Sequence, residues 1–205
     1  MGEAGYCNVC GGSEHEFLLT VRGCDVHRSL RCGLVFVAPL PSAEYLAGIY
    51  NREYFTGESG FGYPPEESYL DRDERLNLFH GRLAKIEAVL GGQGRLLDVG
   101  CATGYCLRAA RERGWEVLGV DISEFAAQYA ASQYGLRVVA GRLQDLECPD
   151  DHFDAVTMWD LLEHVLDPTG ELLQANRVLR PGGVLALSTP CADTPNPNIS
   201  PDDPK

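Results

Sequence analysis

The chain has 205 residues, and its 30 acidic against 17 basic side chains give a formal net charge of −13. This length is enough for one domain with a small appendage, and an apolar content of 44% excludes a wholly disordered chain. The acidic balance argues against nucleic acid and anionic membrane surfaces as partners, because phosphate binding needs a basic face.

The N-terminal segment carries no targeting pattern. Its first ten residues, MGEAGYCNVC, lack the basic and apolar regions of a secretory signal, and no later stretch approaches the ~20 apolar residues of a membrane span. We therefore expect a cytoplasmic protein with no membrane partner, in which thiols stay reduced. Four of the eight cysteines fall in the first 32 residues, and in a reducing compartment this clustering predicts a metal rather than disulfides.

The first 40 residues are interrupted by glycines and predict a small module that cannot bury a core of its own. The stretch from residue 39 to about residue 65 is rich in Pro, Gly and Tyr, and it is predicted to be a connector with aromatic anchors, among them Tyr50, Tyr54 and Phe55. A helix is predicted over residues 68–90, because apolar residues recur at every third or fourth position. Ser68 and Asp71 are its predicted N-terminal cap.

After this helix, apolar strands alternate with helical segments. Strands are predicted at residues 95–99, 115–120, 137–140, 153–159 and 184–189. Helices are predicted at residues 105–113, 123–134, 160–164 and 170–179, with Gly182 and Gly183 ending the last one. The alternation predicts an α/β fold, a Rossmann-like doubly wound sheet of five parallel strands. The proline-rich tail is predicted to be disordered.

The segment LLDVGCATGY, residues 96–105, joins a buried strand to a helix through small residues. Such residues permit a sharp turn, and free N–H groups at the helix start favour a carboxylate or phosphate. The spacing Gly100-x-x-x-Gly104, with Ala102 between, departs from the dinucleotide fingerprint and from the P-loop. Asp121 ends the next strand, where a carboxylate can accept both hydroxyls of a ribose. Taken singly, Asp98 and Asp121 are equally explained as loop-capping acids; together, around this loop, they favour a ligand.

Four segments, LLDVGCATGY, GVDIS, FDAVTMWDLLEHVLDP and RVLRPGGVLALSTP, resemble the successive motifs of class I S-adenosylmethionine-dependent methyltransferases. The resemblance covers about residues 95–190 and implies S-adenosylmethionine as the cofactor. It implies that the glycine loop holds the methionine part, that Asp121 holds the ribose, and that residues after the third strand flank the adenine. The implied cofactor-binding residues are Asp98, Gly100, Cys101, Ala102, Gly104, Asp121, Ile122, Leu143, Gln144, Trp159 and Asp160.

The candidate catalytic base is His164, which follows the fourth strand and can take a proton near neutral pH. Its run Leu-Glu-His-Val-x-Asp-Pro resembles small-molecule O-, N- and C-methyltransferases. A structural role at a helix start is the alternative for His164. Glu163 orients His164, contributes to a metal site as in some relatives, or caps the helix. Asp160 is assigned to the cofactor's amino group, and Trp159 to the pocket wall or simply to the core.

The N-terminal cysteines suggest a zinc site. Cys7-x₂-Cys10-Gly is a knuckle in which two thiolates chelate one tetrahedral ion. Residues 7–55 resemble the zinc-ribbon-like segment of some bacterial methyltransferases, in which the first cysteine of the second knuckle falls at Ser29. Cys24 or His27 is therefore expected to complete the set, or else Cys24 and His27 act together as a Cys-x₂-His pair. A metal-free remnant is the alternative. The predicted ligands of a structural zinc are Cys7, Cys10, Cys24, His27 and Cys32.

These patterns divide the chain into a zinc-ribbon-like module (1–40), a linker with a helix (41–92), an S-adenosylmethionine-binding domain (93–190) and a tail (191–205).

The predicted function is methyl transfer to a small-molecule acceptor such as a sugar or quinone. The alternative is a cofactor-binding but catalytically incomplete regulatory or partner subunit, because the last strands of the class are missing. A nucleic-acid methyltransferase is disfavoured by charge. The aromatic residues of the connector either cover the cofactor or substrate, or pack the module against the main domain. Separately, the exposed fifth strand is an expected route to oligomerisation.

Overall fold

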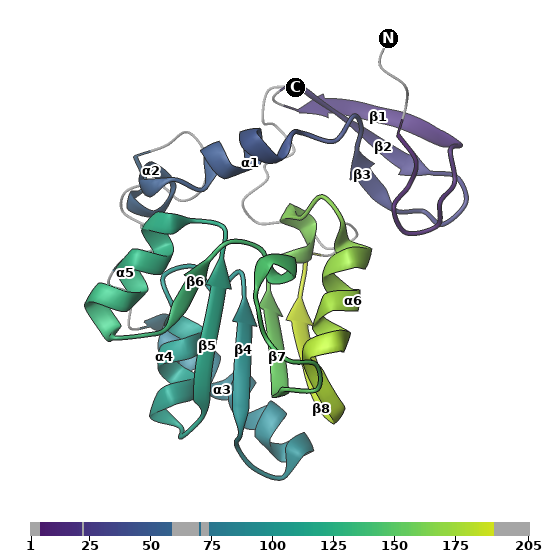
Figure 1. Ribbon diagram of the computed structural model, residues 1–205. Helices are drawn as coiled ribbons and strands as arrows, with labels where there is room; N and C mark the ends of the chain where they lie inside the picture. Colours follow the sequence, from purple (N-terminus) through teal and green to yellow (C-terminus); the bar gives the residue numbers. More distant parts are fainter. Residues whose placement is uncertain (1–4, 22, 59–69, 71–73, 191–205) are drawn as a thin grey trace.

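The computed structural model describes residues 5–21, 23–58, 70 and 74–190, and Figure 1 shows two separate sheets. The smaller sheet is antiparallel, in the order β1-β2-β3, and lies in the cysteine-rich module. Its strands span His15–Val21, Cys24–Ser29 and Val35–Val37. The larger sheet has the order β6-β5-β4-β7-β8, and all of its pairs are parallel, which confirms the predicted five-stranded parallel sheet.

The strands of the larger sheet agree closely with the apolar runs of the sequence. They are β4 (Arg95–Val99), β5 (Glu116–Asp121), β6 (Val138–Ala140), β7 (Phe153–Trp159) and β8 (Leu179–Ser188). The helices are α3 (Glu74–Leu90), α4 (Tyr105–Glu112), α5 (Glu124–Tyr134) and α6 (Pro168–Val178), with short 3₁₀ turns η2 (Leu143–Asp145) and η3 (Leu162–His164). The predicted cap of α3 lies outside the described residues.

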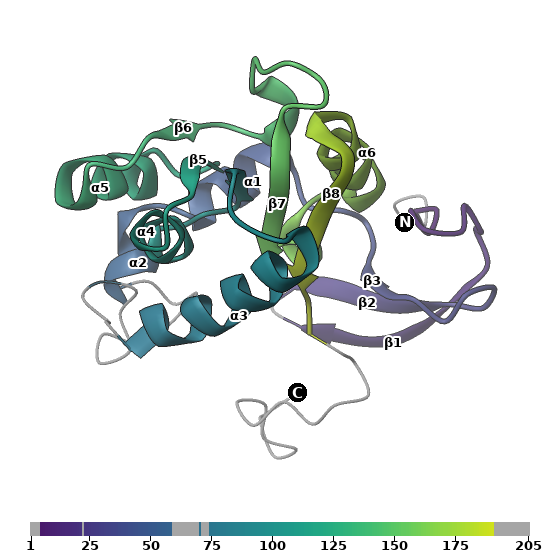
Figure 2. The same ribbon diagram turned by 90° about the horizontal axis from the view of Figure 1, so that it is seen from below.

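Helices cover both faces of the larger sheet, as Figure 2 shows from below. Leu96 packs with residues of α3, α4 and α5, whereas the next residue, Leu97, packs with residues of α6. Successive strand residues point to opposite faces, so a strand buried on both sides reads as a continuous apolar run. This double burial explains why the strands could be predicted without any polar alternation.

The connector contains two short helices. It contains α1 (Ala43–Ile49), whose N-cap Ser42 accepts the N–H of Tyr45, and α2 (Arg52–Thr56), whose N-cap is Asn51. Capping side chains start these helices, although the segment lacks strong apolar periodicity. Residue Phe55 of α2 is buried and its ring lies 5.9 Å from that of Phe125 on α5, so it anchors the connector to the larger domain.

Two boundaries near the C-terminal strand differ from the prediction. The last helix ends at Val178 rather than at the glycine pair, because Leu179 already pairs with Phe153 of β7. The register then shifts before Val184, so Gly182 and its neighbours form an irregular segment within β8. The segment after β7 is helical only at η3, since Asp160 has a positive φ of 51° that an α-helix does not allow.

β8 pairs only with β7 among the described strands and is an edge of the sheet, so oligomerisation through it stays a prediction. Within the described part of the chain, no helix is both long and apolar enough to cross a bilayer.

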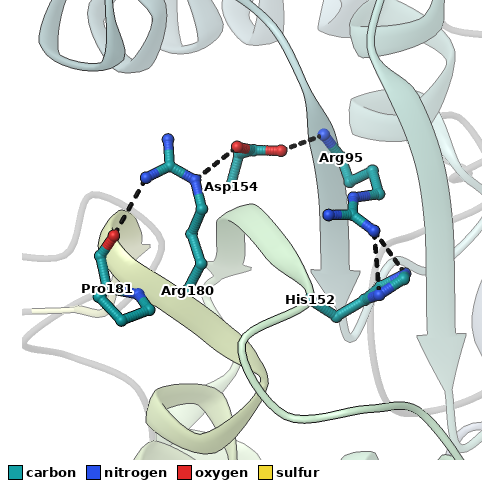
Figure 3. A network of polar contacts seen from close by, with 5 residues as sticks. All are labelled: Arg95, His152, Asp154, Arg180 and Pro181. Atoms are coloured by element: carbon teal, nitrogen blue, oxygen red, sulfur yellow. Dashed lines mark hydrogen bonds and ion pairs between the residues drawn. The ribbon is translucent and has the colours of Figure 1, made fainter.

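The amino ends of β4, β7 and β8 are joined by a polar network (Figure 3). Asp154 accepts the backbone N–H of Arg95 at 2.7 Å and the Nε–H of Arg180 at 2.6 Å. Burial opposes ionisation of Asp154, but these donors hold the pKa of its carboxyl below the ordinary value. The guanidinium of Arg95 in turn lies 3.1 Å from Nδ1 of His152. The network fixes the irregular start of β8 against the strand beside it.

Replacing Asp154 with alanine is expected to lower the free energy of unfolding by about 1–3 kcal/mol, because a half-buried N–H donor and a guanidinium lose their acceptor. Denaturant unfolding of Asp154→Ala measures this loss. Asp150→Ala is the matched control: the Asp150 side chain is 70% exposed in its ion pair with Arg177, and we expect less than about 1 kcal/mol. Equal losses in the two variants would contradict a structural role for the network.

Candidate functional site

The loop between β4 and α4 turns through three residues with positive φ, namely Gly100, Ala102 and Gly104, at 69°, 49° and 89°. A Cβ at Gly104 would lie 2.7 Å from a methyl carbon of Leu136, so this position requires glycine for its backbone angle and for space. The N–H of Gly100 donates to the carbonyl of Val120 at 2.8 Å. This bond fixes the loop to β5 and leaves the start of α4 facing the carboxyl edge of the sheet.

Asp121 ends β5 beside this loop and is only 8% exposed. One of its carboxylate oxygens accepts the N–H of Ala102 at 2.8 Å, and the other accepts the N–H of Ser123 at 2.8 Å. Burial raises the pKa of Asp121 above its ordinary value, although the two N–H donors oppose the shift. Each oxygen keeps further acceptor capacity. The structure thus joins the glycine loop and the acid that the sequence marked separately.

Asp98 on β4 is buried beneath the loop and belongs to a chain of polar contacts. Thr157 on β7 donates its hydroxyl to an Asp98 oxygen at 2.6 Å. The Sγ of Cys106 lies 3.9 Å from the same hydroxyl, and the indole N–H of Trp159 donates to that sulfur at 3.2 Å. Burial raises the pKa of Asp98 to about 7, so its charge changes near neutral pH.

A cavity of about 220 Å³ lies where β4 and β7 end. Several predicted cofactor residues line it, namely Asp98, Gly100, Cys101, Ala102, Trp159 and Asp160. The other predicted cofactor residues lie outside this lining, namely Gly104, Asp121, Ile122, Leu143 and Gln144. The cavity is smaller than typical sites for whole drug-sized ligands. Asp121 lies next to this lining, because its carboxylate accepts the N–H of the lining residue Ala102.

Helix α3 supplies a wall of this cavity that the sequence analysis missed. The guanidinium carbon of Arg82 lies 4.5 Å from the centroid of the Trp159 ring and 5.6 Å from that of Phe79. A guanidinium stacked on aromatic rings keeps its in-plane N–H groups available for a carboxylate. The available signal was the spacing of Arg75, Phe79 and Arg82, which places them on one side of the predicted helix.

The predicted adenine side is built differently from expectation. Leu143 is fully buried and packs in a core cluster with Val120 and Met158, so its side chain serves the core. Gln144, the next residue in the sequence, is exposed. Ile122, which directly follows β5, is exposed as well. The contact of Gln144 with adenine and that of Ile122 with the cofactor stay predictions.

His164, at the end of η3, presents a side chain that is 47% exposed. Its Nε2 lies 4.0 Å from a carboxylate oxygen of Glu163, which leaves the imidazole only loosely oriented by that residue. The ring of Tyr50, from the connector, meets the imidazole edge-on at 6.0 Å. Burial raises the pKa of Tyr50 to about 12, with smaller contributions from the charges of Asp121 and Glu163. Tyr50 thus packs against the predicted base and feels the charge of the predicted ribose acid, with its hydroxyl protonated.

The thiols of Cys7, Cys10 and Cys32 form a compact cluster in the module. All three sulfurs lie within 4.8 Å of one another, and Cys7 Sγ and Cys32 Sγ are 3.6 Å apart. Ser29 Oγ lies 3.4 Å from Cys10 Sγ, and this contact, with the N–H of Gly12, lowers the pKa of Cys10 to about 6. Thiolates are the form that binds metal, so the donor set fits a tetrahedral soft ion.

Cys24 and His27 are not part of this cluster, so their expected place among the ligands is corrected. Nδ1 of His27 is 3.0 Å from Nδ1 of His15, across the hairpin. Cys24 begins β2 while Ser29 ends it. An extended strand rises about 3.3 Å per residue, which separates the two ends of β2 by roughly 16 Å. Spacing in the sequence could not reveal this, because it depends on β2 being extended.

Comparison with known proteins gives the context of these sites. Residues 70–200 match the sequence profile of a family described as a methyltransferase domain. A ubiquinone biosynthesis O-methyltransferase of Alkalilimnicola ehrlichii is 38% identical over 116 residues, which cover 53% of this chain and 47% of that protein. A probable S-adenosylmethionine-dependent methyltransferase of Mycolicibacterium smegmatis is 33% identical over 137 residues, 66% of this chain and 51% of that protein. The chain spans about half the length of the curated relatives it matches.

Solved structures share the fold. A protein from Pyrococcus horikoshii OT3 superposes with a TM-score of 0.51 and 25% identity, covering 57% of this chain and 58% of that one. An amino pentose methyltransferase from Micromonospora echinaspora, solved with S-adenosylmethionine bound, has a TM-score of 0.50 and 26% identity, with coverage of 55% and 50%.

Proposed function

Because the chain belongs to the methyltransferase-domain family, we propose that it transfers the methyl group of S-adenosylmethionine to a small-molecule acceptor. The observation that carries the proposal is the direct bond between the glycine loop and Asp121, from Ala102 N–H to the carboxylate at 2.8 Å. This bond sets Asp121, the acid proposed to bind the ribose, beside a helix N-terminus and beside the Asp98 cavity. A Cβ at Gly100 would lie 2.7 Å from Leu161, so the loop is also shaped by what packs over it.

The residues present fit the two ends of S-adenosylmethionine. Asp121 would accept the ribose hydroxyls. The cavity offers Asp98 to the ammonium of the methionine part and Arg82 to its carboxylate, which are the opposite charges that each group requires. Ligands of open parallel sheets bind outside the carboxyl ends of the strands, where all of these groups lie.

When bound, S-adenosylmethionine supplies a methyl group on a positively charged sulfonium. His164 would take the proton of the acceptor hydroxyl or amine, so that the oxygen or nitrogen attacks with a free electron pair. Tyr50 packs edge-on against His164 and would restrict both the motion of the imidazole and the access of water. Trp159, held by its N–H bond to Cys106, would form the wall behind the reacting groups.

The relatives suggest acceptors for a first test. One is named for O-methylation in ubiquinone biosynthesis, and another acts on an amino pentose. Isotope-labelled S-adenosylmethionine with a catechol probe and an amino pentose probe should yield a labelled product with one of them. Tight cofactor binding without transfer to any acceptor of either class would instead favour a cofactor-binding subunit.

Cofactor binding is expected to weaken about tenfold between pH 8 and pH 6, because the cofactor's ammonium needs Asp98 ionised. The pKa of this buried carboxyl is raised to about 7, so the charge is present above that pH and is lost as the pH falls through it. Calorimetric titration across this range measures the effect. Asp98→Asn should bind weakly with a flat profile over the same window. A profile unchanged in Asp98→Asn would exclude Asp98 as the titrating group.

We extend the proposal to the N-terminal module, where a structural zinc would be held by Cys7, Cys10 and Cys32. The predicted division of the chain is retained, with a module over residues 1–40, a linker and helix over 41–92, and a cofactor domain over 93–190. The module contacts the larger domain where Thr169 Oγ1 of α6 donates to the carbonyl of Asn8 at 3.2 Å. Free thiolates persist in a reducing compartment, which supports the cytoplasm as the location.

A further inference from the structure

The thiol cluster lies between two turns of the same construction. In the first turn, the N–H of Gly11 donates to the carbonyl of Cys7 at 2.8 Å, and the N–H of Cys7 donates to the carbonyl of Gly12 at 2.9 Å. Cys10 lies three residues after Cys7, and Gly11 has a positive φ of 67°. The turn therefore closes on itself and directs the side chains at its first and fourth positions to one side.

The second turn repeats this pattern with one exchange. The N–H of Gly33 donates to the carbonyl of Ser29 at 2.9 Å, and the N–H of Ser29 donates to the carbonyl of Leu34 at 2.9 Å. Cys32 lies three residues after Ser29, and Gly33 has a positive φ of 79°. Ser29 therefore occupies the position in the second turn that Cys7 occupies in the first. Both residues are 1% exposed, whereas their partners Cys10 and Cys32 are nearer the surface.

The hydroxyl of Ser29 is also placed where a ligand atom would be. It lies 3.4 Å from Cys10 Sγ, next to the three-sulfur cluster. It accepts the N–H of Arg31 at 3.3 Å and the N–H of Cys32 at 3.4 Å. Backbone donors of this kind orient the ligands of metal sites from outside the coordination shell. A hydroxyl oxygen has two lone pairs, so coordination would use the lone pair that now accepts one of these long N–H contacts. Three thiolates and this oxygen then give the four donors that tetrahedral zinc requires.

We propose that Ser29 Oγ is the fourth ligand of a zinc ion held by Cys7, Cys10 and Cys32. The inference rests on the zinc site proposed above and does not depend on methyl transfer. A neutral oxygen replaces a thiolate, so the site carries one negative charge fewer than a four-cysteine site and binds a soft metal less tightly. The zinc ion therefore exchanges more readily than it would from a site with four thiolates, and the side chain at residue 29 sets the affinity.

Metal binding to the whole chain tests the proposal without any activity assay. Reduced apoprotein is titrated with Co²⁺ as an optical probe and with Zn²⁺ against a chromophoric chelator. The wild type should bind one ion with a tetrahedral spectrum. Ser29→Cys should raise the thiolate charge-transfer absorption in the ratio of about 4:3 and bind at least about tenfold more tightly, as expected for a fourth soft ligand. Ser29→Ala should bind at least about tenfold more weakly.

Cys24→Ala and His27→Ala are the matched controls, since both residues lie on the same hairpin outside the cluster. They should leave the spectrum and the affinity unchanged. Loss of the tetrahedral spectrum in either control, equal affinity of Ser29→Ala and wild type, or no stoichiometric ion in the wild type would overturn the proposal. Binding of S-adenosylmethionine by each variant shows that the larger domain is folded, and a failure of that binding in the wild type would count against the proposed function alone.

Discussion

Replacing Asp121 with alanine is expected to weaken S-adenosylmethionine binding by at least about a hundredfold. The carboxylate would accept two ribose hydroxyls, and a hydrogen bond to a charged group contributes about 1.5–3 kcal/mol. The same carboxylate holds the N–H groups of Ala102 and Ser123, so its loss also leaves two donors of the loop without their acceptor. Calorimetric titration of the cofactor into both proteins measures the change.

Two controls separate binding from folding in this experiment. Glu124→Ala removes an exposed acid three residues further on, at the start of α5, and should leave the affinity within about twofold, because surface charges contribute little. Asp121→Asn keeps the volume and one acceptor oxygen and should fall between wild type and alanine. Denaturant unfolding of each variant accounts for lost stability. Equal affinity of wild type and Asp121→Ala would refute the proposed site.

Replacing His164 with alanine is expected to lower kcat by about 10²–10⁴, the usual contribution of a positioned general base. Cofactor affinity should stay nearly constant, since His164 does not line the Asp98 cavity. The measurement is steady-state methyl transfer to whichever probe acceptor is turned over.

The matched control is His80→Gln. His80 pairs with Glu112 at 3.3 Å on the surface of α3 and should leave kcat unchanged. Tyr50→Phe keeps the ring that meets His164 and should reduce kcat far less than His164→Ala does, because the phenol is not the group that loses a proton. An unaltered kcat in His164→Ala would return this histidine to a purely structural role at η3.

The larger domain could be read from the sequence in considerable detail. Its strands are buried on both faces, so each appears as an apolar run, and Ser123 and Gly135 mark both ends of α5 through local capping. The spacing of Gly100 and Gly104 and the position of Asp121 at a strand end also marked the loop that we propose binds the cofactor. These features are local: they depend on backbone angles and contacts within a few residues.

Other features depend on partners distant in the sequence. Arg82 faces the cavity because α3 packs against the sheet with one particular side, and Tyr50 meets His164 although 114 positions separate them in the chain. The start of β8 was misplaced because its pairing with Phe153 decides where the strand begins. Composition and periodicity identify which faces are buried, but they do not specify which other segment covers them.

By itself, then, the sequence determined a parallel α/β sheet, its glycine loop, the acid after the second strand and the thiols of an N-terminal knuckle. Only the tertiary structure decided that Ser29, rather than Cys24 or His27, stands beside those thiols. The physical reason is that a metal site requires donor atoms within a few ångströms of one another. Their separation is set by the extended course of β2 and the closure of two turns, and not by the number of residues between them.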